Sequence, residues 1–159
     1  MIDVYLSIGS NFDRSKNIAA ALQLIGEQFG PLTLSPIYES SATDGVGENY
    51  HNLCVSLVSE LSLGELHQQI KMIENTIGRN RDIKAVVAID IDILIFGDQI
   101  IGENESEQLT LPHPDLLRCA HVLTPLTDIA PDLVHPQNQK TIAQLRQEIG
   151  AGESLTKIL

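Results

Sequence analysis

Two aspartates one residue apart interrupt an apolar run between Ile89 and Phe96, and this pattern constrains the chain most. In an extended strand successive side chains alternate between two faces, so Asp90 and Asp92 would project on the same side, roughly 6 to 7 Å apart. The opposite face would carry a period-two apolar row that can anchor the strand in a core. That row consists of Val87, Ile89, Ile91, Ile93 and Ile95.

The pattern alone leaves two interpretations of this acidic face open. Two carboxylates on one face repel each other unless a positive charge lies between them. Hard oxygen ligands suit Mg²⁺, which usually brings substrate phosphates with it, so Asp90 and Asp92 could clamp a metal. The other interpretation is a strand whose polar face is merely solvated.

Length and composition indicate one ordinary domain. A chain of 159 residues, 43% of them hydrophobic, can bury a core of normal size, and we expect one domain over 1–159. No window approaches the roughly 18 uninterrupted apolar residues of a membrane span, and the N-terminus has no basic segment before an apolar stretch. We therefore expect a cytoplasmic protein with no membrane partner.

The two cysteines, Cys54 and Cys119, do not suggest a metal centre by their spacing. They fit neither a zinc pattern nor a disulfide-dense scaffold, which agrees with a reducing cytosol. We interpret both as core or surface thiols.

The formal charge of −11 argues against nucleic acid as a partner, because that affinity comes mainly from Lys and Arg on phosphates. Between Lys16 and Lys71 the chain has no Lys or Arg. A site for a polyanion must therefore recruit Arg79, Arg81, Lys84 or Arg118, or rely on metal ions or backbone N–H groups.

Hydrophobic periodicity predicts an alternation of strands and helices. Strands are expected over 4–8, 32–41 and 50–58, helices over 15–28 and 62–77, and a loop over 42–49. With the aspartate strand the order is strand, helix, strand, strand, helix, strand, which is a ferredoxin-like α+β sandwich. A short helix near 115–119 and a helical segment over 141–149 would be C-terminal additions to it.

Tyr50 and Asn52 are expected to share one face of the strand over 50–58. Leu53, Val55 and Leu57 would occupy its other face.

Several motifs occur along the chain in a fixed order. They are Ile8-Gly9-Ser10-Asn11, Ser35-Pro36-Ile37-Tyr38, Glu48-Asn49-Tyr50-His51-Asn52, Ile73-Glu74 with Gly78-Arg79-Asn80-Arg81, the aspartate strand with Gly97, and Leu111-Pro112-His113-Pro114. In these motifs and their order the chain resembles the 6-hydroxymethyl-7,8-dihydropterin pyrophosphokinases of folate biosynthesis. The resemblance covers most of the chain.

The resemblance implies transfer of the β,γ-pyrophosphoryl group of ATP to the hydroxymethyl oxygen of the pterin, with release of AMP. By this resemblance Asp90 and Asp92 are ligands of two Mg²⁺ ions that grip the triphosphate, neutralise developing charge and keep attacking and leaving oxygens in line. Arg79 and Arg81 would reach phosphate from the loop that follows the helix.

The resemblance also implies roles for residues around the aspartates. Tyr50 is similar to the aromatic that packs beside the pterin, and Asn52 to the amide that recognises its ring edge. Glu74 and His113 match nucleotide-site positions.

Structural interpretations stay open beside these roles. Tyr50 could be an ordinary strand aromatic, the two arginines could be helix-end cations, and His113 could be merely structural. For Asn11 a helix cap is favoured over a ligand contact.

The chain departs from the family pattern at three places, one of which is Gln108, where the family commonly has a basic residue. The family usually has a Trp and then Gly-Pro-Arg-Thr before the aspartates, whereas this chain has the shorter stretch 84–88 without Arg or Trp. After the matched histidine the family often has a phosphate-binding arginine and a pterin-stacking phenylalanine, where this chain has Cys119 and His121. Arg118 could compensate for the arginine, and His121 could still stack on a pterin.

The sequence thus predicts an Mg²⁺-dependent pterin pyrophosphokinase of divergent type, a monomer or weak homodimer that uses ATP. The alternative is a non-catalytic or weakly catalytic pterin-binding paralogue that acts as a regulator or as a subunit. A third possibility is transfer to a different hydroxyl-bearing heterocycle.

Overall fold

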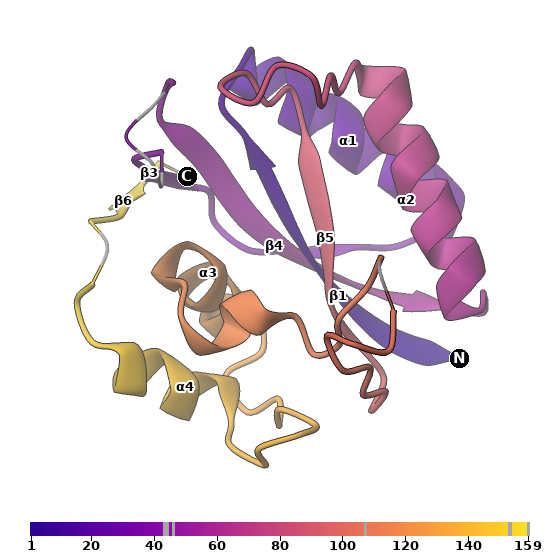
Figure 1. The fold of residues 1–159 in the computed structure, drawn as a ribbon, viewed down its shortest axis with the longest axis vertical. Coiled ribbons are helices and arrows are strands. Elements are labelled where there is room, and N and C mark those ends of the chain that lie inside the picture. The colour runs from indigo at the N-terminus through magenta and orange to yellow at the C-terminus, as the bar shows by residue number, and fades with distance from the viewer. Residues whose placement is uncertain (43–44, 46, 107, 153, 159) are drawn as a thin grey trace.

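One antiparallel sheet with strand order β5-β1-β4-β3-β6 forms the centre of the molecule (Figure 1). This computed structural model describes residues 1–42, 45, 47–106, 108–152 and 154–158. The loop predicted over 42–49 therefore includes three residues, 43, 44 and 46, that lie outside the described ones.

The sheet is made of long central strands and short edge strands. The strands are β1 (Ile2–Ser10), β2 (Thr33–Leu34), β3 (Tyr38–Ser40), β4 (Tyr50–Ser59), β5 (Asp90–Phe96) and β6 (Thr156–Lys157). The helices are α1 (Arg14–Phe29), α2 (Leu63–Ile77), the 3₁₀ helix η1 (Pro114–Leu117), α3 (Ala120–Ile129) and α4 (Ile142–Ile149).

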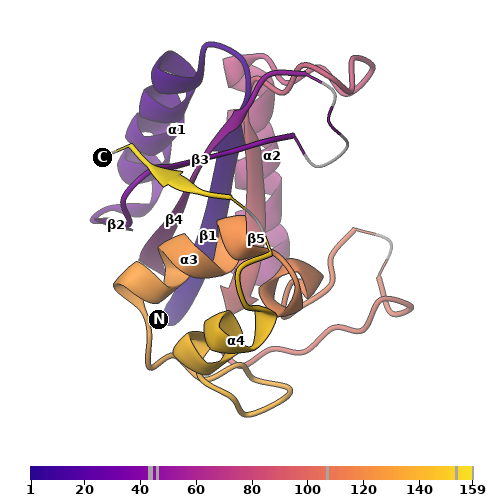
Figure 2. The same ribbon diagram turned by 90° about the vertical axis from the view of Figure 1, so that its left-hand side faces the viewer.

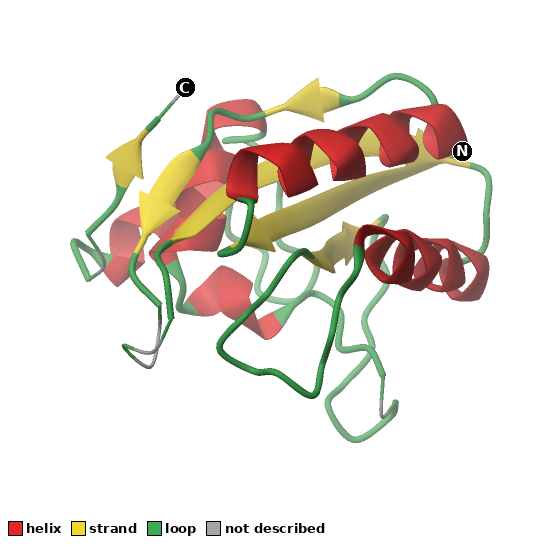
Figure 3. Ribbon diagram, turned by 90° about the horizontal axis from the view of Figure 1, so that it is seen from above, coloured by secondary structure: helices red, strands yellow, loops and turns green. Residues whose placement is uncertain are grey.

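Helices cover the sheet on both faces (Figures 2 and 3). Helices α1 and α2 lie on one face, where the apolar sides of β1, β4 and β5 meet residues such as Ile25, Leu66 and Ile70. Helices α3 and α4 lie on the other face, over a second cluster that contains Leu123 and Leu126. Burial of apolar area on both faces makes the sheet a central layer.

The structure confirms the ferredoxin-like order that the sequence predicts. Strand β1 lies between β4 and β5, and α1 and α2 are the two crossovers of the split βαβ arrangement. Ser62 caps α2: its hydroxyl accepts the Glu65 N–H, and the Glu65 carboxylate accepts the Ser62 N–H.

One local prediction differs from the structure, and two elements of the structure were not predicted. The single strand expected over 32–41 is split into β2 and β3, because Pro36 has no N–H for a ladder. Helix α3, which supplies Val122, Leu123 and Leu126 to the second cluster, was not predicted, and neither was β6. The Tyr38 hydroxyl donates to Asp128, which ties β3 to α3.

The apolar row on β5 ends earlier than alternation predicts. Tyr5 pairs with Ile95 but Leu6 pairs with Ile93, so Leu94 is an extra residue on β5 and forms a bulge. As a result Ile95 lies in the cluster under α3 and α4 instead of the cluster under α1 and α2.

Asn11 does not cap a helix, so that interpretation was wrong. Its amide Nδ2 donates to the Ala85 carbonyl at 2.9 Å, and its Oδ1 accepts the Val87 N–H at 2.6 Å. The N-cap position of α1 is Asp13, which makes no side-chain cap bond. Asn11 instead fixes the segment that enters β5.

Within the described part of the chain, no helix combines the length and apolar character needed to cross a membrane.

We predict that the second helical layer contributes strongly to stability. Leu123→Ala, at a fully buried position, should lower the free energy of unfolding by about 2 to 5 kcal/mol, because it leaves a cavity between α3 and the sheet. Leu117→Ala is the matched control, since Leu117 is 51% exposed, and it should change stability by less than about 0.5 kcal/mol. Urea unfolding measures both, and equal losses would show that the layer does not pack as described.

Candidate active site

Strand β5 places Asp90 and Asp92 on the same face, as the alternation predicts. Asp90 pairs with Gly9 and Asp92 with Ser7 on the neighbouring strand β1. Their side chains are 43% and 38% exposed, and both line one large cavity of about 870 Å³.

This cavity brings together most of the residues that the sequence singled out. The predicted residues that line it are Asp90, Asp92, Tyr50, Asn52, Arg118 and His121. Asp90 and Asp92 come from β5, Tyr50 and Asn52 from β4, Arg118 from the segment that joins η1 to α3, and His121 from α3. The sequence predictions of a shared face for Tyr50 and Asn52 and of proximity to the aspartates therefore agree with the geometry.

The cavity floor depends on a residue without a side chain. A Cβ on Gly9 would lie 3.0 Å from Asn52 Oδ1 and 3.6 Å from the Tyr50 ring. A contact of 3.0 Å is tighter than most contacts of real Cβ atoms, so a side chain at this position would displace the Asn52 amide. The Ile8-Gly9-Ser10-Asn11 motif contained this signal, but sequence alone gave no reason for the glycine.

The side-chain amide of Asn52 is fixed by a hydrogen bond to the neighbouring strand β3. Its Nδ2 donates to the Ser40 Oγ at 2.8 Å, and the residue is only 5% exposed. This bond leaves the amide carbonyl oxygen on the Gly9 side.

Burial disfavours ionisation of the two carboxyls on the acidic face. The pKa of the Asp92 carboxyl is raised to about 7, mainly by burial and to a smaller extent by repulsion from Asp90 and Asp115. Burial also raises the pKa of Asp90, while the Arg79 guanidinium opposes that rise. Oxygen donors that resist ionisation side by side are suited to a hard cation, which removes the repulsion.

Glu74 holds the outer side of β5 rather than lining the cavity. Its side chain is completely buried, and its Oε2 accepts the Ile91 N–H at 2.9 Å. Its Oε1 pairs with Lys71 at 3.0 Å and with Arg81 at 2.9 Å. Direct contact between Glu74 and a nucleotide stays a prediction, and the observed contacts support an action through Arg81.

Arg79 lies next to the aspartates at the start of β5. Its Nη1 donates to the Ile89 carbonyl at 3.0 Å and lies 3.5 Å from Asp90 Oδ1. Neither Arg79 nor Arg81 lines the large cavity.

His113 lies on the other side of Asp92. Its Nε2 is 3.9 Å from Asp92 Oδ2, and its Nδ1 accepts the Asp115 N–H at 3.1 Å. Together with Lys71 it lines a second hollow of about 360 Å³, to which Asp92 also contributes. Burial lowers the pKa of His113, which favours a neutral imidazole. Asp92 thus lies between two hollows, one with Tyr50 and Asn52 and one with His113.

The structure adds cavity residues for which the sequence gave no site role. Asp115 and Cys119 line the cavity beside Arg118, whose Nη2 lies 3.1 Å from Asp115 Oδ1. The contribution of Asp115 and Cys119 depends on η1 and α3 folding back over the sheet, which no periodicity indicates. Lys84, one of the cations that the sequence offered for a polyanion site, also lines the cavity, from the shortened stretch before β5.

Comparison with known proteins identifies the family. The model of the 7,8-dihydro-6-hydroxymethylpterin-pyrophosphokinase (HPPK) family matches residues 5–131. The chain belongs to this family. A 2-amino-4-hydroxy-6-hydroxymethyldihydropteridine pyrophosphokinase of Aquifex aeolicus is 32% identical over 151 residues, 93% of this chain and 92% of the relative. The enzyme of that name from Haemophilus influenzae is 34% identical over 87% of this chain and 88% of the relative.

Solved structures show the same HPPK fold. A Plasmodium falciparum HPPK-DHPS triple mutant superposes with a TM-score of 0.73 at 17% identity over 92% of this chain. The wild-type P. falciparum HPPK-DHPS with pteroate has the same TM-score, also at 17% identity over 92% of this chain. This HPPK chain spans 43% and 42%, respectively, of those longer chains.

The acidic face should make the stability of this HPPK chain depend on pH. Because the pKa of Asp92 is raised from 3.8 to about 7, the folded state keeps a proton that the unfolded chain releases. The free energy of unfolding should therefore fall as pH rises through this range. Asp92→Asn cannot ionise and should be more stable than the wild type at pH 8. The expected gain is only about 1 kcal/mol, because the side chain is 38% exposed and solvent screening reduces the energetic effect of the pKa shift.

Urea unfolding at pH 5 and pH 8 with a chelator measures this difference, which should be much smaller at pH 5. Asp98→Asn, on an exposed turn after β5, is the matched control and should show no such pH dependence. An Asp92→Asn variant that is less stable than the wild type at pH 8 would contradict the charge balance described here.

Glu74 should be essential for the stability of this HPPK chain. Glu74→Gln removes the charge that compensates Lys71 and Arg81 in a fully buried position, and should cost about 3 kcal/mol of the free energy of unfolding. Glu60→Gln, on the exposed segment before α2, should be nearly neutral. Thermal unfolding compares the two, and a neutral Glu74→Gln would rule out the anchoring role.

Proposed function

We propose that this chain transfers the pyrophosphoryl group of ATP to the hydroxymethyl group of 6-hydroxymethyl-7,8-dihydropterin and releases AMP. Family membership over residues 5–131 supports this reaction. The observation that carries the proposal is the position of Asp90 and Asp92 on one strand face, with Asp92 shared between two hollows. One hollow would take the acceptor and the other the triphosphate, so that the two substrates meet at the carboxylates.

The donor set fits the magnesium that such a reaction uses. Asp90 and Asp92 would hold two Mg²⁺ ions, since both side chains are oxygen donors that repel each other without a cation. The bound ions would neutralise charge on the transferred group and polarise the bond to the leaving phosphate. Through these ions the two aspartates would fix the position of the triphosphate. Arg79, whose Nη1 lies 3.5 Å from Asp90 Oδ1, would partly balance the charge of Asp90.

The cavity on the β4 side fits a flat heterocycle with donors on its edge. The Asn52 carbonyl oxygen, fixed by the bond from Nδ2 to Ser40, would accept an N–H of the pterin edge. Tyr50 would pack beside the ring, and His121 would approach it from α3. Because Gly9 adds no side chain there, the ring can approach the sheet closely.

The hollow on the other side of Asp92 would take ATP phosphates. Lys71 and His113 line it, and a neutral imidazole can donate one hydrogen bond to a phosphate oxygen. Arg81 is 47% exposed and would reach phosphate while Glu74 holds its guanidinium. All these residues belong to one chain, so we expect a monomer or a weak homodimer to be active.

The test is AMP formation from ATP, Mg²⁺ and the hydroxymethyl-dihydropterin. Asp90→Asn and Asp92→Asn should each lower kcat/KM by about 100-fold or more, because each removes a ligand for the charge that stabilises the transition state. Asp98→Asn is the matched control and should keep the wild-type rate.

Calorimetry on the wild type distinguishes the enzyme from a pterin-binding paralogue. Binding of both pterin and ATP·Mg²⁺ to the wild type, with AMP formation, supports the enzyme. Pterin binding without AMP formation or ATP·Mg²⁺ affinity would overturn it in favour of a pterin-binding paralogue. A panel of other hydroxyl-bearing heterocycles tests the acceptor, and preference for one of them would revise the substrate.

A further inference from the structure

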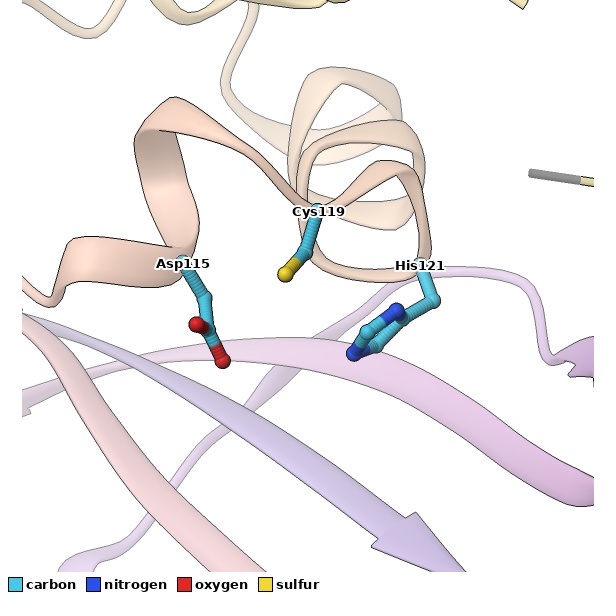
Figure 4. A group of neighbouring side chains, drawn as sticks. All are labelled: Asp115, Cys119 and His121. Carbon is cyan, nitrogen blue, oxygen red and sulfur yellow. The ribbon is translucent and has the colours of Figure 1, made fainter. Parts of the chain in front are cut away.

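Three side chains of different chemistry converge in the lining of the large cavity. The carboxylate of Asp115, the thiol of Cys119 and the imidazole of His121 each offer one atom, and these atoms lie within 4.8 Å of one another (Figure 4). All three side chains are partly buried and project toward the sheet, Asp115 from η1, Cys119 from the junction after it and His121 from the first turn of α3. In the described part of the chain this is the only such group of three possible metal ligands that was found.

The backbone fixes the spacing of these side chains. The Cys119 N–H donates to the Asp115 carbonyl at 2.9 Å, so the two residues are joined across one turn. Leu116 and Ala120, which lie between the three residues in sequence, are 0% and 1% exposed and pack into the core. The segment therefore cannot rotate freely, and the three polar side chains are held on the cavity side.

The chemistry of this set selects the class of ligand. Thiolate, imidazole and carboxylate together are typical ligands of Zn²⁺, with bonds of roughly 2.0 to 2.3 Å in a tetrahedron. Ligand atoms in such a tetrahedron are roughly 3 to 4 Å apart, so rotation of the side chains is enough to close a group within 4.8 Å. Three protein ligands leave a fourth position for a water or a substrate atom, as in catalytic zinc sites.

Arg118 is compatible with this arrangement. Its Nε and Nη2 both lie 3.1 Å from Oδ1 of Asp115. A carboxylate has a second oxygen that can bind a metal while the first accepts hydrogen bonds. Partners of this kind orient a ligand and are common around metal sites.

We propose that Asp115, Cys119 and His121 form a binding site for a soft divalent metal of the Zn²⁺ class, separate from the Asp90 and Asp92 pair. The fourth position of the metal opens into the large cavity, which all five residues line.

The site explains why the two departures after His113 occur together. Cys119 and His121 stand where relatives often have an arginine and a phenylalanine, and either change alone would give one ligand instead of a pair. A bound dication restores positive charge at the position of the arginine and offers its open position to a phosphate oxygen or a heteroatom of the acceptor. This role rests on the proposed function, whereas the metal site itself does not.

The test is titration of untagged, metal-free protein with Co²⁺, a spectroscopic substitute for Zn²⁺. We expect one equivalent to produce a thiolate-to-Co²⁺ charge-transfer band that a slight excess of Zn²⁺ removes and millimolar Mg²⁺ does not. Cys119→Ser should abolish the band. His121→Ala and Asp115→Asn should each weaken Co²⁺ affinity at least about tenfold, since each removes a ligand.

Matched controls separate this site from the rest of the protein. Cys54→Ala removes the other thiol, which is fully buried in the core, and should keep the band. The double variant Asp90→Asn with Asp92→Asn should also keep it, even though AMP formation is lost. A wild-type titration without the band, or a band that survives Cys119→Ser or is unaffected by both His121→Ala and Asp115→Asn, overturns the proposal.

Loss of folding in a variant is detected independently. Circular dichroism shows whether each variant is folded, and a thermal shift of the wild type by Zn²⁺ that is absent in folded His121→Ala supports the site. If Zn²⁺ gives the same shift in wild type and in folded His121→Ala, the imidazole is not a ligand and the proposal fails. Because these measurements use metal alone, they are independent of whether the pyrophosphokinase reaction occurs.

Discussion

The structure depends on keeping two carboxylates side by side on a strand that is otherwise part of the core. Ionised neighbours on one strand face repel, and burial adds to that cost, so the strand must be held by other interactions. Glu74 accepts the Ile91 N–H between the two aspartates, and Asn11 fixes the segment that enters β5. Both contacts lie outside the cavity, which allows the acidic face to remain open toward substrates.

The two faces of the sheet differ in what they contribute to folding and to function. The face under α1 and α2 carries the larger apolar cluster. The face under α3 and α4 is apolar at one end and polar at the other, where β1, β4 and β5 form the cavity floor. The same segment that begins α3 therefore closes the second core and supplies Arg118 and His121 to the cavity, so packing there positions the functional side chains.

Much of this arrangement could be predicted because it depends on local periodicity. Alternation placed Asp90 and Asp92 on one face of their strand and Tyr50 and Asn52 on one face of theirs, whereas pairing through β1 brings both pairs to the same cavity. Alternation failed at Leu94, because a bulge is set by pairing with β1 and not by the residues of β5 alone. Helix α3 was missed because Pro125 lies inside it and a proline normally argues against a helix.

The balance of charge in the cavity explains why the sequence alone could not assign the groups that bind phosphate. A chain with a formal charge of −11 has no general attraction for ATP, and Asp90, Asp92 and Asp115 add three carboxylates to a single cavity. Arg79 and Arg81 are engaged with Asp90 and Glu74, so they offset acidic groups before they can offset phosphate. Nucleotide binding in such a cavity requires that cations bind with the triphosphate or before it. The metal site that we propose at Asp115, Cys119 and His121 would meet this requirement, because a bound dication supplies positive charge inside the cavity.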